Sequence, residues 1–251
     1  MPMTADVSRR RRCATLLAAV GLGVLGTACG GEEPSSAAPA SPGTPAGGMP
    51  AGSAVPDALP GTPPEVAEAL LTTDDLGRGW TDLGALPLDE RGLDECPASQ
   101  VITAGEDPMR RGEAQSLYAQ DDRDVPTFGE SVSLWQSADV ARDRMAEFAT
   151  LPTDCPPVER EVPDGGTATV RHLAADAPAL GDEAVALVHE IRLPEGTIVL
   201  RDVVVVRIGD ALVLTEGPDV AADDPALGDV RQQFAELTAQ AVDKAAQELT
   251  P

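Results

Sequence analysis

Residues 183–215 read EAVALVHEIRLPEGTIVLRDVVVVRIGDALVLT and contain three predicted strands joined by two short turns. Glu183–Leu193 alternates between apolar and polar residues, and a Pro-Glu-Gly turn leads into a second, longer strand, Thr197–Ile208. Gly209-Asp210 then forms a two-residue hairpin turn into Ala211–Thr215. Because turns this short join antiparallel neighbours, the stretch predicts an antiparallel meander.

The middle strand of this meander is predicted to be central in its sheet. Val203–Val206 is an uninterrupted apolar run, and successive side chains of a strand point to opposite faces, so both faces must be buried. A long C-terminal helix is expected to cover one of these faces. Its apolar residues recur at spacings of three and four: Leu227, Val230, Phe234, Leu237, Ala241, Ala245 and Leu249.

The region before the meander predicts further, shorter elements. A helix is expected to start at Pro63-Pro64 with Thr62 as its N-cap and to close on the glycines that precede Trp80. The remaining predicted elements are strands at 113–119 and 129–135, a helix at 138–150 that Leu151-Pro152 ends, and a weakly alternating strand at 167–174. The predicted fold class is α+β, an antiparallel sheet packed with helices, in one domain over residues 62–251.

The composition excludes some classes of partner. The 251 residues carry a formal net charge of −24, and the only lysine is Lys244. Binding to nucleic acid depends on clustered Lys and Arg side chains, so we expect no nucleic-acid partner. The acidity is otherwise typical of a protein that must stay soluble outside the cell.

The N-terminus has the three parts of an export signal. Arg9–Arg12 is cationic, residues 13–25 are apolar but too short to span roughly 30 Å of hydrocarbon, and small residues lead to Cys29. The sequence Gly26-Thr27-Ala28-Cys29 resembles the lipobox of bacterial lipoproteins, although that pattern prefers Leu where Gly26 stands.

The lipobox resemblance implies that residues 1–28 are a signal peptide and that the Cys29 thiol carries diacylglycerol. The chain would then sit on the outer face of the cytoplasmic membrane, with the membrane as a partner through Cys29. An ordinary secretory signal cleaved nearby is the alternative. The arginine run also suggests twin-arginine export, but the apolar residues that normally follow the arginine pair at fixed spacing are missing.

Residues 29–61 are predicted to be a linker. Pro, Gly, Ala and Ser make up 25 of the 32 residues 30–61, and nothing in this stretch could form a core. A flexible chain of this length reaches on the order of 30 Å, which lifts a folded domain clear of the lipid headgroups.

Two cysteines remain for the folded part, because Cys13 belongs to the signal and Cys29 to the anchor. An exported protein meets oxidising conditions, so we predict a disulfide between Cys96 and Cys155. In the chain-entropy description, closing a loop of this size stabilises the fold by roughly 4 kcal/mol. Two free thiols or a redox couple are the alternatives, although the CxxC spacing of reactive pairs is absent.

No catalytic motif is recognisable in the sequence. The residue three before Lys244 is Ala241, so the S-x-x-K motif of penicillin-binding proteins is missing, and Gly129-Glu130-Ser131 does not continue as the G-x-S-x-G of hydrolases. A phosphate-binding GxxxxGK[ST] loop is absent too. We therefore expect a non-enzymatic protein with no catalytic residues and no cofactor.

Metal binding is not expected either. His172 and His189 lie on separate predicted strands, and His189 has apolar neighbours, which favours a buried structural histidine. If the strands are adjacent the two rings can approach, but Glu190 would point to the opposite face and could not be a third ligand. The acidic runs 121–124 and 223–224 lack the spacing and the glycine of an EF-hand loop, and are expected to be solvated, with weak calcium binding as the alternative.

Taken together, the features resemble the PknH-like extracellular sensor-domain proteins of actinobacteria. The resemblance rests on Leu70-Leu71 to Asp75-Leu76, Gly79-Trp80, the strand ending in Trp135, the helix that runs to Cys155, and Leu180-Gly181-Asp182-Glu183 before the meander and the long helix. It covers residues 62–250. It implies an antiparallel sheet with a cleft for an unidentified extracellular ligand. The kinase member has two disulfides, whereas this chain has cysteines for one.

The leading functional hypothesis is a surface-tethered, sensor-like domain that binds an unidentified extracellular ligand or envelope protein. A carrier of lipid or other hydrophobic cargo is the second hypothesis, with the cargo enclosed by the meander and the C-terminal helix. A hydrolase that acts on wall material through scattered carboxylates is the third. The sequence names no ligand-binding residues.

The lipid anchor leads to a direct prediction. Cys29→Ala removes the thiol that accepts diacylglycerol, so the variant should lose metabolic labelling with a clickable palmitate analogue. Cys13→Ala is the matched control, because it removes a cysteine of the signal and should leave labelling unchanged. A Cys29→Ala protein that still takes up label would show that the anchor is elsewhere.

Overall fold

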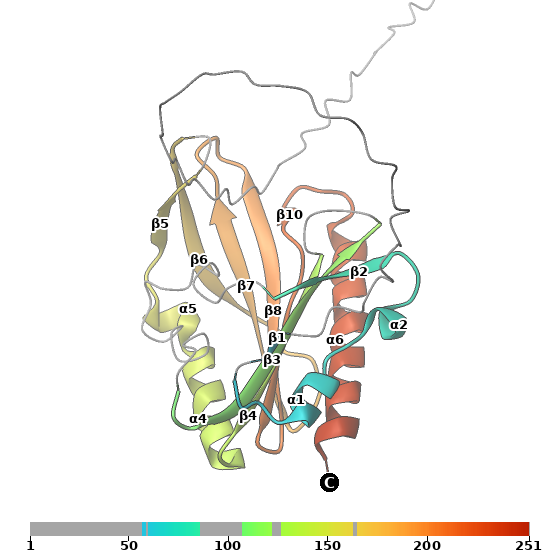
Figure 1. Ribbon diagram of the computed structural model, residues 1–251. Coiled ribbons are helices and arrows are strands. Elements are labelled where there is room, and N and C mark those ends of the chain that lie inside the picture. Colours follow the sequence, from blue (N-terminus) through green and yellow to red (C-terminus); the bar gives the residue numbers. More distant parts are fainter. Residues whose placement is uncertain (1–56, 59, 86–106, 122–126, 163–164, 251) are drawn as a thin grey trace, which may run out of the picture. The chain divides into compact units, whose positions relative to one another are not determined.

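The computed structural model describes residues 57–58, 60–85, 107–121, 127–162 and 165–250, all within one unit of the chain, Gly48–Pro251 (Figure 1). The helices are α1 (Pro64–Glu68), α2 (Thr73–Leu76), α4 (Ala138–Ala149), α5 (Leu151–Asp154) and α6 (Leu227–Leu249). The strands are β1 (Asp57–Ala58), β2 (Trp80–Gly84), β3 (Arg110–Gln120), β4 (Phe128–Trp135), β5 (Val158–Glu161), β6 (Thr167–Ala175), β7 (Glu183–Arg192), β8 (Ile198–Ile208), β9 (Ala211–Glu216) and β10 (Val220–Ala221).

Ten strands of the described chain form one sheet in which every pairing is antiparallel. Its order is β1-β3-β4-β9-β8-β7-β6-β5, with β2 paired to β3 and β10 paired to β8. After β4 the chain passes through α4 and α5 to the far edge of the sheet, and β5–β9 return as a meander that ends beside β4. The predicted α+β class and the predicted meander are confirmed.

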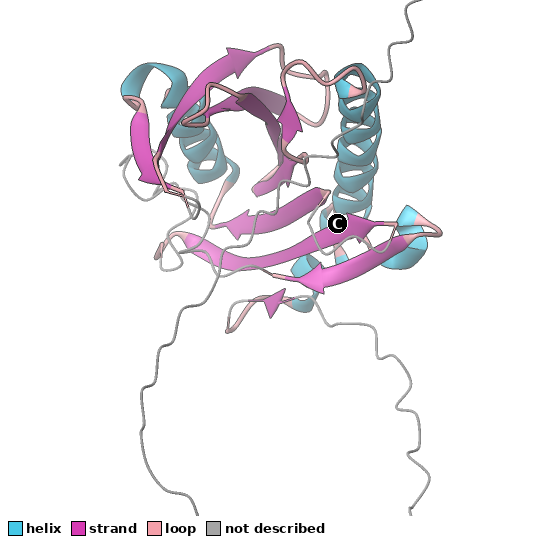
Figure 2. Ribbon diagram, turned by 90° about the horizontal axis from the view of Figure 1, so that it is seen from above, coloured by secondary structure: helices cyan, strands magenta, loops and turns pink. Residues whose placement is uncertain are grey.

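Strand β8 is buried on both faces, as its valine run predicts. Val204 and Val206 pack with Phe234 of α6, whereas Val203 and Val205 pack with α4. The sheet therefore separates two hydrophobic cores. The strands curve, and α4 and α6 cover opposite faces (Figure 2).

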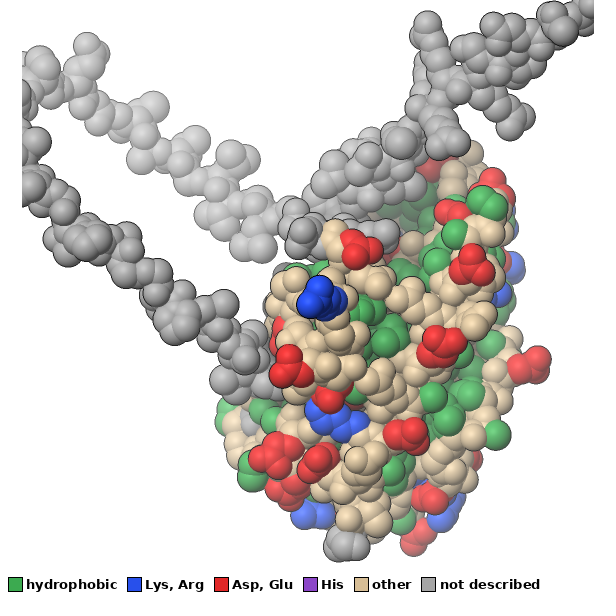
Figure 3. All heavy atoms as spheres, turned by 90° about the vertical axis from the view of Figure 1, so that its right-hand side faces the viewer, with side chains coloured by type: hydrophobic (Ala, Val, Ile, Leu, Met, Phe, Trp, Pro, Cys, Tyr) green, Lys and Arg blue, Asp and Glu red, His purple; other side chains and the backbone are tan. Residues whose placement is uncertain are grey.

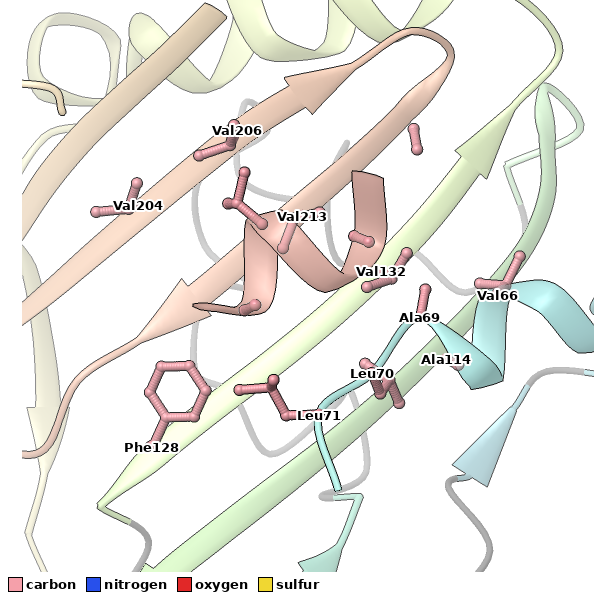
Figure 4. Packing of buried hydrophobic residues seen from close by; sticks show 14 of the residues in the cluster. Val66, Ala69, Leu70, Leu71, Ala114, Phe128, Val132, Val204, Val206 and Val213 are labelled. Carbon is pink, nitrogen blue, oxygen red and sulfur yellow. The ribbon is translucent and has the colours of Figure 1, made fainter. Parts of the chain in front are cut away.

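Helix α6 buries one stripe of side chains along its 23 residues, as predicted. The buried positions are Phe234, Thr238, Ala241, Val242 and Ala245, and the predicted Leu237 and Leu249 pack partly buried against the same core. The segment that contains α1 adds further apolar side chains to this core. Figure 4 shows Val66, Ala69, Leu70 and Leu71 over Val132 and the neighbouring strands.

The start of α1 differs from the prediction. Pro63 occupies the N-cap position without a side-chain hydrogen bond, so the predicted Thr62 cap is wrong. The Thr62 hydroxyl instead donates to the Glu113 carbonyl and accepts from the Glu113 amide, both at 3.1 Å. Thr62 thus ties the chain to strand β3 at the point where α1 begins.

The stretch before Trp80 forms a second helix rather than the end of the first. Thr72 and Asp75 make a reciprocal capping box that starts α2, and Gly77 ends that helix. Short β2 follows and pairs with β3. Asp57 and Ala58, which fall within the predicted linker, also pair with β3 as β1.

Two glycines with positive φ allow a prediction about stability. A Cβ added to Gly181 (φ +58°) would lie 2.5 Å from both the Arg207 carbonyl oxygen and Val206 Cγ1, whereas one added to Gly196 (φ +90°) would meet nothing within 4 Å. Gly196→Ala should lower the free energy of unfolding by about 1 kcal/mol, from backbone strain alone. Gly181→Ala should lower it by about 3 kcal/mol, because steric overlap is added. Urea denaturation of both variants measures the difference, and equal losses would contradict the close packing at Gly181.

Candidate functional site

A groove with a volume of about 240 Å³ lies between α6 and the strands β7 and β8. Apolar side chains dominate its lining: Leu180 before β7, Ala186 on β7, Val204 on β8 and Phe234 on α6. Phe234 also contacts Phe128, with ring centroids 6.2 Å apart, so the core holds it in place. The groove is thus a largely apolar surface built on a helix and two strands of the sheet.

The polar groups along the groove are mostly paired with one another. Arg231 donates to both carboxylate oxygens of Asp202, at 2.9 and 3.1 Å, which links α6 to β8. The Thr238 hydroxyl is 3.0 Å from that of Thr215, on β9. Asp176 is an exposed carboxylate on the lining. The groove therefore offers apolar contact with charged groups on its lining, and Asp176 gives it an acidic bias.

Two side chains of the sheet hold the connection between α1 and α2. The Leu71 amide donates to Glu130 Oε2 at 2.9 Å, and the Leu71 carbonyl accepts from the Tyr118 hydroxyl. Helix α6 holds the same segment through Lys244, whose ammonium lies 2.5 Å from Asp75 Oδ2. These contacts fix the N-terminal segment on the α6 face of the sheet.

Burial changes the acidity of Glu130, which is 2% exposed. Its pKa is raised to about 8, because burial removes water from the carboxylate. The Leu71 hydrogen bond and the charge of Lys244 lower the pKa but do not offset this effect. Glu130 is consequently protonated at neutral pH, and its Oε1 is buried without a hydrogen-bond partner among the described residues.

A second buried polar cluster lies under α4. Glu113 accepts from Ser131 at 2.9 Å and forms an ion pair with Arg110. The Arg110 and Arg144 guanidinium carbons lie 5.1 and 5.6 Å from the Trp135 ring centroid, within cation–π range. A space of about 20 Å³ remains beside these groups, which is room for one water molecule rather than a ligand.

The two histidines come together as the adjacent strands allow. His172 on β6 is directly opposite His189 on β7, and their ring centroids are 4.7 Å apart. Glu190 forms a bidentate pair with Arg171 at 2.9 and 3.0 Å, on the opposite face of the sheet. Within the described ranges, no group of three or more His, Cys, Asp or Glu residues is arranged to hold a metal ion.

Several predicted site residues lie outside the described residues, namely Cys29, Cys96 and residues 122–124. Cys155 is 7% exposed and follows α5. Lipidation of Cys29 and the Cys96–Cys155 disulfide therefore stay predictions. Asp224 accepts from the Ala226 amide at 2.8 Å, so this carboxylate organises the turn that leads into α6.

Sequence reasoning missed Glu130, Asp202 and Arg231. The burial of Glu130 could have been predicted, because Glu130 alternates in sequence with Phe128, Val132 and Leu134, all of which are buried. A carboxyl group on an apolar face is uncommon and marks a buried polar contact. No sequence pattern predicts the Asp202–Arg231 pair, since it depends on how α6 crosses the sheet.

No family model matches this chain, and no curated protein matches it in sequence. The solved structures that are similar to it include two mycobacterial proteins. The extracellular domain of PknH from Mycobacterium tuberculosis is 12% identical with a TM-score of 0.45, over 73% of this chain and 96% of that domain. A putative uncharacterized protein from Mycobacterium smegmatis is 14% identical with a TM-score of 0.37, over 73% of this chain and 98% of that one. None of the helices in the described part of the chain is long and apolar enough to cross a membrane.

The raised pKa of Glu130 predicts how stability depends on pH. Below about pH 4.5 the carboxyl group is protonated in both the folded and the unfolded chain. Between pH 4.5 and 8 only the unfolded chain ionises, so the folded state loses stability as the pH rises. Glu130→Gln keeps an acceptor for Leu71 and cannot ionise.

Glu130→Gln should have the same free energy of unfolding as the parent near pH 4.5. At pH 7 its free energy of unfolding should be higher than that of the parent by roughly 3 kcal/mol. Urea denaturation at the two pH values measures this difference. A gap between the two proteins that does not change with pH would contradict the assignment.

Proposed function

We propose that the chain is a lipid-anchored protein of the outer face of the cytoplasmic membrane, and that its folded part is a non-enzymatic binding module. The groove between α6, β7 and β8 is the proposed ligand site. The observation that carries this proposal is its chemistry, an apolar lining of Leu180, Ala186 and Phe234 beside the Asp202–Arg231 pair. Ligand sites of proteins typically combine apolar walls with a few polar groups that orient the ligand.

The pairing of polar groups supports binding rather than catalysis. A catalytic nucleophile needs a base within hydrogen-bond reach, and that base is in turn oriented by a third group. In the groove, Thr238 is engaged by Thr215 and Asp202 by Arg231. These contacts leave the groove with groups that hold its shape and give it polarity.

The size of the groove favours a small ligand or a few side chains of a partner over lipid cargo. Pockets that bury drug-sized ligands have volumes of roughly 300–1,000 Å³, and a diacyl lipid needs more than such a ligand. At about 240 Å³ the groove lies below that range. The carrier hypothesis is therefore the second candidate.

The exposed surface agrees with a partner that is neither nucleic acid nor an anionic lipid surface. Acidic side chains are spread over the face that carries α6, and basic ones are few (Figure 3). Such a surface repels polyanions and leaves ligand recognition to local features such as the groove.

Native mass spectrometry of the full-length protein, purified in detergent from the membranes of its own host, tests the proposal. A bound species of reproducible mass should be released from the parent protein on activation. Ala235→Trp should abolish it, because Ala235 lines the groove and an indole would fill the space. Gln232→Trp, an exposed position of α6 outside the lining, should retain it.

Loss of the bound species in both variants would contradict the location of the site. A parent protein that carries no bound species would contradict the ligand proposal. A species with the mass of a diacyl lipid that Ala235→Trp removes would favour the carrier instead.

A further inference from the structure

The connection between β6 and β7 forms one wall of the groove and places a carboxylate there. Its residues Asp176, Pro178 and Leu180 line the groove. Asp176 is exposed, and among the described residues no group forms a hydrogen bond or an ion pair with it. The Asp176 carboxylate is therefore available to a ligand in the groove.

Both ends of this wall are attached to the sheet. Asp182 accepts hydrogen bonds from Arg207 Nη1 at 3.0 Å and from the Gly209 amide at 2.8 Å, at the turn between β8 and β9. The Asp182 amide in turn donates to the Arg207 carbonyl at 2.9 Å. At the other end, Ala175 is the last residue of β6 that pairs with β7, and Asp176 follows it directly. The pairing of the sheet thus holds Asp176 at the edge of the groove.

The arginine on the lining does not cancel the charge of Asp176. Arg231 donates to both carboxylate oxygens of Asp202, so that pair is neutral as a whole. One arginine against two aspartates leaves the lining with a formal charge of −1. Asp229 complements the positive end of the α6 dipole in the first turn of the helix. The electrostatics of the groove therefore favour a cation over an anion.

The walls of the groove indicate an organic cation rather than a metal ion. Ca²⁺ takes about six to eight oxygen ligands, which one available carboxylate beside apolar walls does not supply. In the described part of the chain, no group of three or more His, Cys, Asp or Glu residues is arranged to hold a metal ion. Leu180, Ala186 and Phe234 instead offer contact to an apolar body. An ammonium group can donate to Asp176 while its apolar part lies against these walls.

We propose that the groove binds a small organic amine. Its protonated amino group pairs with Asp176, and a compact apolar body contacts Leu180, Ala186 and Phe234. This inference rests on the proposed function of the groove and names the class of its ligand. The volume of about 240 Å³ suits a small amine better than a long-chain one. The formal net charge of −24 adds a long-range attraction for cations.

Three compounds that share one ring and differ in charge test this ligand class. They are cyclohexylamine, which is protonated at pH 7, cyclohexanol and cyclohexanecarboxylate. Saturation-transfer difference NMR on the full-length protein in detergent, with the detergent alone as the blank, gives a dissociation constant for each compound. The amine should bind about tenfold more tightly than the alcohol, and the carboxylate should bind most weakly.

Variants of the groove locate the contact. Asp176→Asn should weaken binding of the amine about tenfold and leave binding of cyclohexanol unchanged, because it removes the charge and keeps the shape. Asp176→Glu keeps the carboxylate and should retain most of the affinity. Ala235→Trp should abolish binding of the amine and of the alcohol, since Ala235 lines the groove.

Asp143→Asn is the matched control for the loss of one negative charge. Asp143 is an exposed residue of α4, which covers the face of the sheet opposite to the groove. This variant should leave the dissociation constant of the amine unchanged. Equal weakening in Asp143→Asn and Asp176→Asn would mean that the amine responds to the overall charge of the chain, which would overturn the proposed contact.

The remaining outcomes separate the ligand class from the site. Equal binding of all three compounds that Ala235→Trp removes would leave the groove as the ligand site and show that the inference about amines is wrong. Tighter binding of the carboxylate would assign recognition to Arg231 and overturn the inference. Amine binding that survives Ala235→Trp would place the amine outside the groove. If no compound binds, the inference fails, and the native mass spectra decide separately on the proposed function.

Discussion

The burial of β8 on both faces is the constraint on which the rest of the structure depends. Four successive valines cannot be shielded from water by one layer, because alternate side chains point in opposite directions. Burying each of them contributes about 1.5–3 kcal/mol, so neither face can be left exposed without a large loss of stability. The sheet consequently needs a helix on each side, and the chain supplies α4 before the meander and α6 after it.

The same strand explains where the candidate sites lie. The valine run begins at Val203. The two residues before it, Arg201 and Asp202, point to opposite faces of β8. On the α6 face, Asp202 meets Arg231 on the lining of the groove. On the other face, Arg201 is opposite His189 and donates two hydrogen bonds to Asp219. The two faces of β8 thus carry different charged pairs at adjacent residues, where core packing no longer dictates the side chains.

The long elements could be predicted from sequence because their periodicity extends over many residues. The alternation of β7 and β8 and the stripe of α6 each repeat several times, so that single exceptions such as Thr238 do not hide them. The short elements α2, β1, β5 and β10 span two to four residues and have no periodicity to detect. They depend on tertiary contacts, such as the pairing of β10 with β8.

The candidate sites were less predictable than the fold because they depend on register. Sequence alternation showed that His189 and Glu190 face opposite ways, but only the pairing of β6 with β7 places His172 against His189. The Thr62 cap failed for a related reason. The Thr62 hydroxyl makes two hydrogen bonds with the backbone of Glu113 on β3, whereas capping the helix would give it only one.

The arginines around β8 help to hold the fold of this acidic chain together. Arg201, Arg207 and Arg231 each face a carboxylate within 3.0 Å, so they neutralise acids that the fold brings close to β8. A chain with 42 acidic residues and 18 basic ones has carboxylates to spare for every arginine. Acidic residues outnumber basic ones, so many carboxylates remain without a basic partner and give the chain its formal net charge of −24.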